Sequence, residues 1–182
     1  AGRDDIAAVI AMTPLTSGAA VSRAAVAHRD VGSALKWTAI GLKSRVDVGR
    51  GRRPTMMPLV AHPGEPGGLT LAGAYESYTA LAGPTWRNEV DSAVGLQIAG
   101  IRTADAARRL RCPALFQIAD FDRYVPAESV VKTAELARGV VHHYPCDHFD
   151  VWPGHDWFDK AAADQVAFLN RVLSREASAA LP

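Results

Sequence analysis

The alternation of strands and helices in the last third of the chain most limits what it can fold into. Residues 114–119 and 140–144 form short, mostly apolar runs typical of strands, and a helical pattern over 127–138 separates them. A second helical pattern follows at 156–173, with Phe158, Ala162, Val166, Leu169 and Val172 predicted on one apolar face. Strands that alternate with helices favour a parallel sheet covered by those helices.

A third strand is predicted near the start of the chain. Residues 6–12 are apolar and stop at Thr13-Pro14. Their length and β-branched residues favour a buried strand, although the alanines among them would also suit a helix. The predicted fold class is therefore α/β, with a narrow, mostly parallel sheet whose edges need covering.

The region between the first and second strands has a different character. A helical pattern spans about 19–42, and five basic residues then fall within 43–53. No aromatic residues alternate with these charges, so a solvated face is favoured over a nucleic-acid contact. Five prolines interrupt residues 54–84, so only a short helix within 69–81 is expected there. The secondary structure of residues 86–99 stays open.

Composition excludes several classes of protein. The 182 residues are 48% hydrophobic and 21% charged with a net charge of +1, which is ordinary for a globular domain and favours neither nucleic acid nor membrane as a partner. The longest apolar runs fall well short of the roughly 18 residues of a membrane span. Two cysteines, Cys112 and Cys146, cannot form a disulfide framework, so we expect a cytoplasmic location.

The N-terminus has no features of a signal peptide. It opens on Ala1 and a short polar segment, without a basic region followed by an apolar one. This is how a chain joined or processed in mid-protein would begin.

An acid and a histidine follow two successive predicted strands. Asp122 lies three residues after the strand at 114–119, and His148 lies four residues after the strand at 140–144. Ligands of open α/β sheets bind beyond the carboxyl ends of the strands. There, a histidine can act as general base while an acid fixes its tautomer and stabilises the imidazolium. We therefore predict Asp122 and His148 as catalytic residues, with Asp120 as the competing acid.

Two other chemistries are disfavoured. Seven potential metal ligands fall within fifteen positions, but their spacing matches no known zinc motif. Adjacent His142 and His143 would also face opposite sides of a sheet. Cys146 precedes the histidine and does not occupy a nucleophile turn, so a reactive thiol is not expected. We predict neither a metal site nor a cofactor.

Several segments together resemble the C-terminal half of the α/β-hydrolase superfamily. The matching segments are the strand start Cys112–Phe116, the acid turn Asp122–Pro126 (D-x-x-v-P), the histidine loop Tyr144–Asp150, the terminal helix around Asp164–Leu169 and the opening strand Asp5–Pro14. The proline- and glycine-rich region and Trp86–Glu89 are similar to the cap of bacterial members that resemble dienelactone hydrolase and acyl-peptidase-like enzymes.

The resemblance also implies that these residues lack the part of a hydrolase that carries the nucleophile. No G-x-S-x-G nucleophile turn occurs in the sequence. The resemblance therefore implies that residues 1–14 and 104–182 form the C-terminal part of the hydrolase core, with a cap or lid insertion at 15–103. The expected partner is an N-terminal half that carries a serine nucleophile and the oxyanion hole, and an oligomer is compatible with this arrangement.

Two functions follow from this interpretation. The first is ester, thioester or amide hydrolysis of a small acyl substrate through an acyl-enzyme, with Asp122 and His148 serving a nucleophile outside these residues. Dehalogenation with an aspartate nucleophile, a reaction that related folds perform, also stays open. The alternative is a non-catalytic, degenerate hydrolase that acts as a binding or interaction module.

Overall fold

The computed structural model describes residues 3–27 and 31–179. The chain divides into two compact units, one made of residues 1–21 and 102–182 and the other of residues 22–101. Helix α1 (Gly18–Ala27) includes the boundary between them. The assignment of the second unit as a cap stays a prediction.

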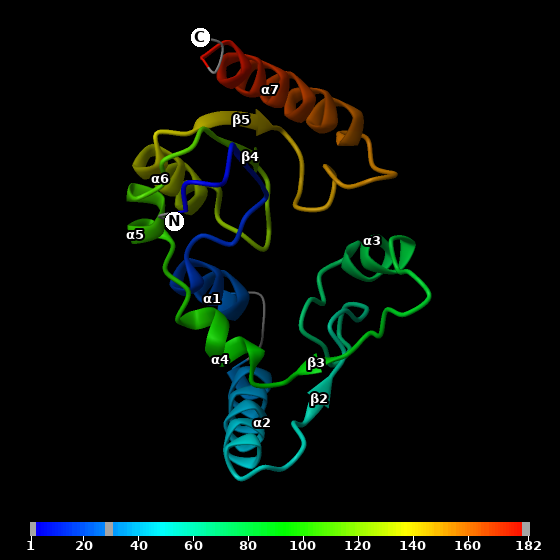
Figure 1. The fold of residues 1–182 in the computed structure, drawn as a ribbon. Helices are drawn as coiled ribbons and strands as arrows, with labels where there is room; N and C mark the ends of the chain where they lie inside the picture. The colour runs from blue at the N-terminus through cyan, green and yellow to red at the C-terminus, as the bar shows by residue number, and fades with distance from the viewer. Residues whose placement is uncertain (1–2, 28–30, 180–182) are drawn as a thin grey trace. The chain divides into compact units, whose positions relative to one another are not determined.

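The first unit contains a three-stranded sheet (Figure 1). Strands β1 (Val9–Met12), β4 (Ala114–Ala119) and β5 (Val140–Tyr144) run parallel in the order β1-β4-β5. Every residue of the central strand β4 is buried, as expected of a parallel strand covered on both faces. The predicted parallel α/β sheet is confirmed, although its first strand begins at residue 9 and not at residue 6.

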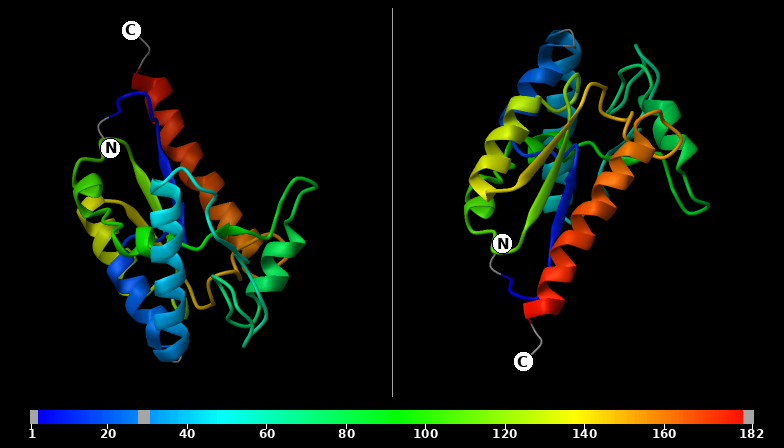
Figure 2. Two further views of the ribbon diagram at one scale, coloured as in Figure 1. Left: turned by 90° about the horizontal axis from the view of Figure 1, so that it is seen from below. Right: turned by 90° about the horizontal axis from the view of Figure 1, so that it is seen from above.

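Helices cover both faces of this sheet (Figure 2). Helices α5 (Ala104–Arg108) and α6 (Ala127–Ala137) lie on one side, and the long α7 (Phe158–Ala179) lies on the other. Because side chains alternate along a strand, Phe116 packs toward α6 whereas Leu115 packs against Phe168 of α7. The unit therefore has two apolar layers with β4 between them.

The buried face of α7 agrees only in part with the predicted one. Val166 is 56% exposed, so its expected place on the apolar face is wrong. The buried positions are Ala161, Phe168 and the predicted Val172, and the first two lie on either side of Gln165 along the helix. Gln165 turns toward the sheet because its amide donates a hydrogen bond of 2.6 Å to Gln117 Oε1. A polar contact, and not apolar spacing alone, thus sets the rotation of this helix.

The turn from α6 into β5 needs its glycine for space. Arg138 has a left-handed backbone with φ of 53°, and the Gly139 N–H donates to the Ala134 carbonyl. A Cβ atom on Gly139 would lie 2.7 Å from the Phe116 ring. Any larger residue here would push into the core beneath β4.

The second unit is built around α2 (Val31–Gly49) and a two-stranded antiparallel sheet of β2 (Met56–Met57) and β3 (Val90–Asp91). Helices α3 (Ala74–Ala80) and α4 (Val94–Ala99) complete it. The predicted short helix within 69–81 corresponds to α3.

Buried hydrogen bonds hold this unit together. Ser44 on α2 is fully buried, donates to Asp91 Oδ1 at 2.7 Å and accepts the Thr55 N–H at 2.9 Å. The first two residues of the basic segment, Lys43 and Arg45, lie on α2. Asp47 accepts from Lys43 at 2.6 Å, so part of this basic charge is balanced within the helix.

Candidate active site

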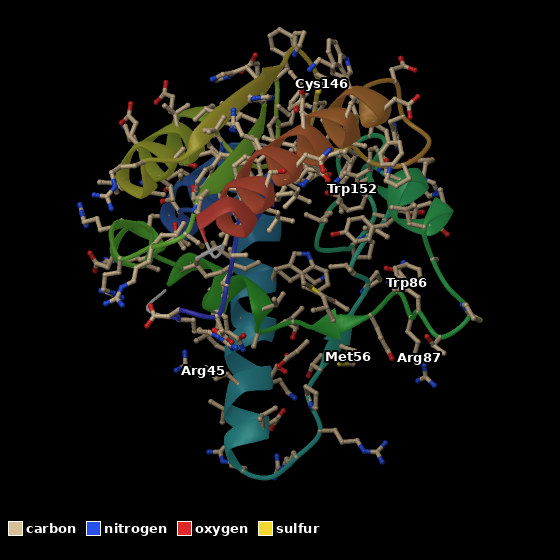
Figure 3. The ribbon with its side chains drawn as sticks, turned by 45° about the horizontal axis from the view of Figure 1, so that its top comes forward. Arg45, Met56, Trp86, Arg87, Cys146 and Trp152 are labelled. Atoms are coloured by element: carbon tan, nitrogen blue, oxygen red, sulfur yellow. The ribbon has the colours of Figure 1, made fainter. Side chains whose placement is uncertain are left out.

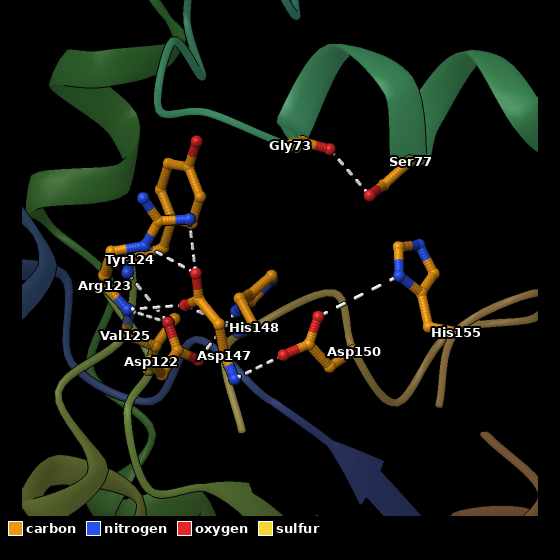
Figure 4. A network of polar contacts seen from close by, with 10 residues as sticks. All are labelled: Gly73, Ser77, Asp122, Arg123, Tyr124, Val125, Asp147, His148, Asp150 and His155. Atoms are coloured by element: carbon orange, nitrogen blue, oxygen red, sulfur yellow. Dashed lines mark hydrogen bonds and ion pairs between the residues drawn. The ribbon is translucent and has the colours of Figure 1, made fainter. Parts of the chain in front are cut away.

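The predicted acid and histidine lie together beyond the carboxyl ends of β4 and β5. Ala119 and Tyr144 are register partners, so the two loops leave the sheet at the same level. His148 Nδ1 lies 2.7 Å from Asp122 Oδ2 (Figure 4). The side chains are 3% exposed for Asp122 and 15% for His148. This distance and burial describe a hydrogen-bonded acid–histidine pair shielded from solvent.

The local backbone fixes the orientation of Asp122. Its Oδ1 accepts the N–H groups of Tyr124 at 2.8 Å and Val125 at 2.7 Å. This is the way an aspartate side chain closes a tight turn, and α6 begins directly after the turn at Ala127. Because Oδ1 is engaged by the backbone, Oδ2 is the atom presented to His148.

Aromatic rings surround the His148 imidazole. Tyr124 and Phe149 contact it edge-on, with ring centroids 5.6 and 4.7 Å away, and Trp152 lies at 6.4 Å. Trp152 and Cys146 lie on the segment between β5 and α7 (Figure 3). These rings limit rotation of the imidazole and lower the local polarity around it.

The competing acid is placed differently. Asp120 Oδ1 lies 2.6 Å from His143 Nδ1, and both side chains are substantially exposed. His142 contacts Asp164 of α7 at 3.1 Å. Adjacent His142 and His143 thus meet different partners, as expected for neighbours on a strand, and only Asp122 contacts His148 among the two candidate acids.

A second polar contact joins the two loops beside this pair. Asp147 Oδ1 accepts the N–H of Arg123 at 3.0 Å and the N–H of His148 at 2.8 Å, and Oδ2 accepts from the Arg123 guanidinium (Figure 4). Burial tends to raise the pKa of Asp147, but these hydrogen bonds outweigh it and the pKa is lowered. Asp147 is one of the seven potential metal ligands counted in the sequence and lies within the histidine loop Tyr144–Asp150, but no motif signals this contact.

Cys146 is poorly suited to nucleophilic chemistry. Its side chain is buried, and burial, together with nearby carboxylates of which Asp150 is the strongest, raises the pKa of its thiol to about 12. The thiol is therefore protonated at neutral pH.

Two further features are absent from the described residues. No group of three potential ligands able to hold a metal ion occurs in residues 3–27 and 31–179. None of the helices in that same part of the chain has the length and apolar character needed to cross a membrane.

A buried polar network supports the sheet from the α7 side. The fully buried Gln117 donates to the Tyr144 hydroxyl at 2.7 Å and to the Ala161 carbonyl at 2.9 Å. Tyr144 in turn donates to Asp164 at 2.9 Å, and burial raises the pKa of its hydroxyl. The only hint of this network in the sequence is a glutamine in the middle of an apolar strand.

Comparisons with known proteins agree with this architecture. No protein-family model matches the sequence. The chain is 29% identical over 171 residues to the quorum-quenching protein AidA of Acinetobacter baumannii, covering 92% of this chain and 55% of that protein.

Solved structures are similar in fold at low sequence identity. The α/β hydrolase GrgF from Penicillium sp. sh18 matches with a TM-score of 0.66 and 18% identity, over 95% of this chain and 58% of that one. The structure of DcsB in complex with its substrate analogue matches with a TM-score of 0.64 and 17% identity, over 94% and 58%. The chain thus spans little more than half the length of each of these three proteins.

Proposed function

We propose that this chain, which has an α/β-hydrolase fold spanning part of the length of its relatives, supplies the acid and the histidine of a serine hydrolase active site. His148 is the general base and Asp122 is its orienting acid. The nucleophile and the oxyanion hole belong to a part of the enzyme outside these 182 residues. The reaction class is hydrolysis of an ester, thioester or amide.

The observation that carries this proposal is the 2.7 Å contact between Asp122 Oδ2 and His148 Nδ1. A carboxylate at this distance favours the imidazole tautomer with its proton on Nδ1, which leaves Nε2 as the basic nitrogen. Within the described residues, His148 Nε2 makes no hydrogen bond, so it is available to accept a proton from a nucleophile. The relatives named above support a hydrolase of this fold.

The chemistry proceeds in two steps. Nε2 removes the proton of the serine hydroxyl as its oxygen attacks the carbonyl carbon, and the same proton then passes to the leaving group as its bond to that carbon breaks. Water attacks the resulting acyl-enzyme in the same way, with Nε2 again carrying the proton. The buried Asp122 carboxylate stabilises the imidazolium formed in both steps.

We also infer that residues 15–103, which include the second unit, form a cap insertion that influences which acyl substrate the enzyme accepts. The short strands and proline-rich connections of this unit build no large sheet of their own. Because the Acinetobacter relative is named a quorum-quenching protein, quorum-sensing signal molecules are the first substrates to test.

The test is fluorophosphonate labelling of the intact enzyme as its native cell makes it, read by denaturing mass spectrometry. We expect an adduct on a serine outside these residues, and we expect His148→Ala to abolish it. His143→Ala is the matched control, because His143 also contacts an aspartate but lies exposed, and it should label normally. Equal labelling of the His148→Ala enzyme would exclude His148 as the base. Absence of any adduct in the unmodified enzyme would favour a binding module.

A further inference from the structure

We propose that Asp147 is a positioning residue for the Asp122–His148 pair: it links the acid turn, Asp122–Pro126, to the histidine loop, Tyr144–Asp150. Through this link it keeps His148 Nδ1 within reach of Asp122. The role rests on the proposed function, since it concerns the alignment of the same two residues.

The contacts of Asp147 are distributed over both loops. Its Oδ1 accepts the backbone N–H of Arg123, which directly follows the acid, and the backbone N–H of His148 itself. Its Oδ2 accepts from both Nε and Nη2 of the Arg123 guanidinium. One carboxylate therefore holds the backbone beside each member of the pair.

The other end of Asp147 is also fixed. Its own N–H donates to Asp150 Oδ2 at 2.8 Å, and Asp150 Oδ1 lies 3.9 Å from His155 Nδ1 (Figure 4). The hydrogen bond between the Asp147 N–H and Asp150 thus keeps Asp147 in place within the histidine loop. The Asp147 carboxylate then connects this loop to Arg123 in the acid turn.

The exposure of the Arg123 and Asp147 side chains indicates that their contact contributes more to the alignment of the site than to the stability of the fold. The side chains are 43% exposed for Arg123 and 22% for Asp147, and ion pairs that contact water contribute little to folding. The two backbone N–H groups, in contrast, lie one residue from Asp122 and on His148 itself. Since a displacement of about 1 Å in a catalytic group can cost about a hundredfold in rate, alignment is the larger effect expected here.

The test measures the His148 ring directly and does not require hydrolysis. In the purified, ¹⁵N-labelled protein, the Nδ1 proton of His148 should give a protected, downfield resonance because it is donated to Asp122. Asp147→Ala should make this proton exchange with water about tenfold faster, which corresponds to about 1.4 kcal/mol of local opening free energy. Asp147→Asn keeps an oxygen for the two N–H groups, so its exchange rate should lie between the two.

The control is Asp105→Ala, which removes the exposed contact to Arg108 on α5 and should leave the His148 proton unchanged. A merely structural role would accelerate exchange equally at the amides of β4, whereas a positioning role affects His148 selectively. Exchange of His148 at the unmodified rate in Asp147→Ala would refute the proposal, and so would acceleration that is uniform over β4. If the alanine variant does not fold, Asp147→Asn decides by the same criteria. Failure of fluorophosphonate labelling alone would leave this result unaffected and would refute only the hydrolase.

Discussion

Replacing the buried Gln117 by Met should destabilise the protein by about 2 kcal/mol. Methionine is close to glutamine in size, so the change removes polar atoms and leaves little cavity. It deletes three hydrogen bonds, to the Tyr144 hydroxyl, the Ala161 carbonyl and the Gln165 amide, each with a net value of about 1 kcal/mol. Burying a thioether in place of an amide returns about 1 kcal/mol of this loss, because the amide is costly to desolvate.

The assay is urea unfolding followed by circular dichroism, analysed by linear extrapolation. Gln97→Met is the matched control because Gln97 is exposed, and its effect should stay within about 0.5 kcal/mol. Adding Gln165→Met to Gln117→Met should cost less than the sum of the two single changes, since the partner amide is then no longer left unpaired. A loss below about 0.5 kcal/mol for Gln117→Met would refute the network as a source of stability.

Three further predictions follow from the same contacts. Asp122→Asn should lower the rate of fluorophosphonate labelling by about a hundredfold or more, because an amide favours the wrong imidazole tautomer; an unchanged rate would contradict the pairing. Burial tends to raise the pKa of Asp164, but Lys160, His142 and Tyr144 outweigh it and lower that pKa to about 2. The resulting stability is full above about pH 4 and is lost as the pH falls toward 2, so unmodified protein should lose about 2 kcal/mol more than Asp164→Asn between pH 5 and pH 2 in urea unfolding. Gly139→Ala should cost about 1–3 kcal/mol by the same method, because its methyl group would overlap the Phe116 ring, whereas Gly95→Ala, with open space around it, should not.

Local sequence patterns were sufficient for the strands that carry the site. Residues 114–119 and 140–144 are strands with the bounds expected, because each is a short apolar run closed by a clear turn signal. The first strand is shorter than its apolar run, since pairing with β4 begins only at Val9 and Ile6 is 39% exposed. An apolar run thus indicates a strand, but the neighbouring strand decides how much of it is paired.

Polar contacts between residues far apart in the sequence could not be predicted from local patterns. The orientation of α7 depends on Gln165 meeting Gln117, two residues that are 48 positions apart. The apolar spacing that suggested Val166 as a core residue is equally compatible with a helix rotated by one position. Similarly, β2 and β3 contain two residues each and owe their place to tertiary hydrogen bonds such as Ser44 to Asp91.

The candidate site depends both on strands that the sequence predicts and on polar contacts that it does not predict. Ala119 and Tyr144 are register partners, so positions in the two loops can be compared by their offset from the sheet. Asp122 and His148 lie three and four residues beyond it, and Arg123 and Asp147 lie four and three residues beyond it. The two contacts therefore cross from loop to loop side by side, although neither an arginine after an aspartate nor an aspartate before a histidine is informative in a sequence. A change of one residue in the length of either loop would displace both pairs together, so the offsets determine this site as much as the residue types do.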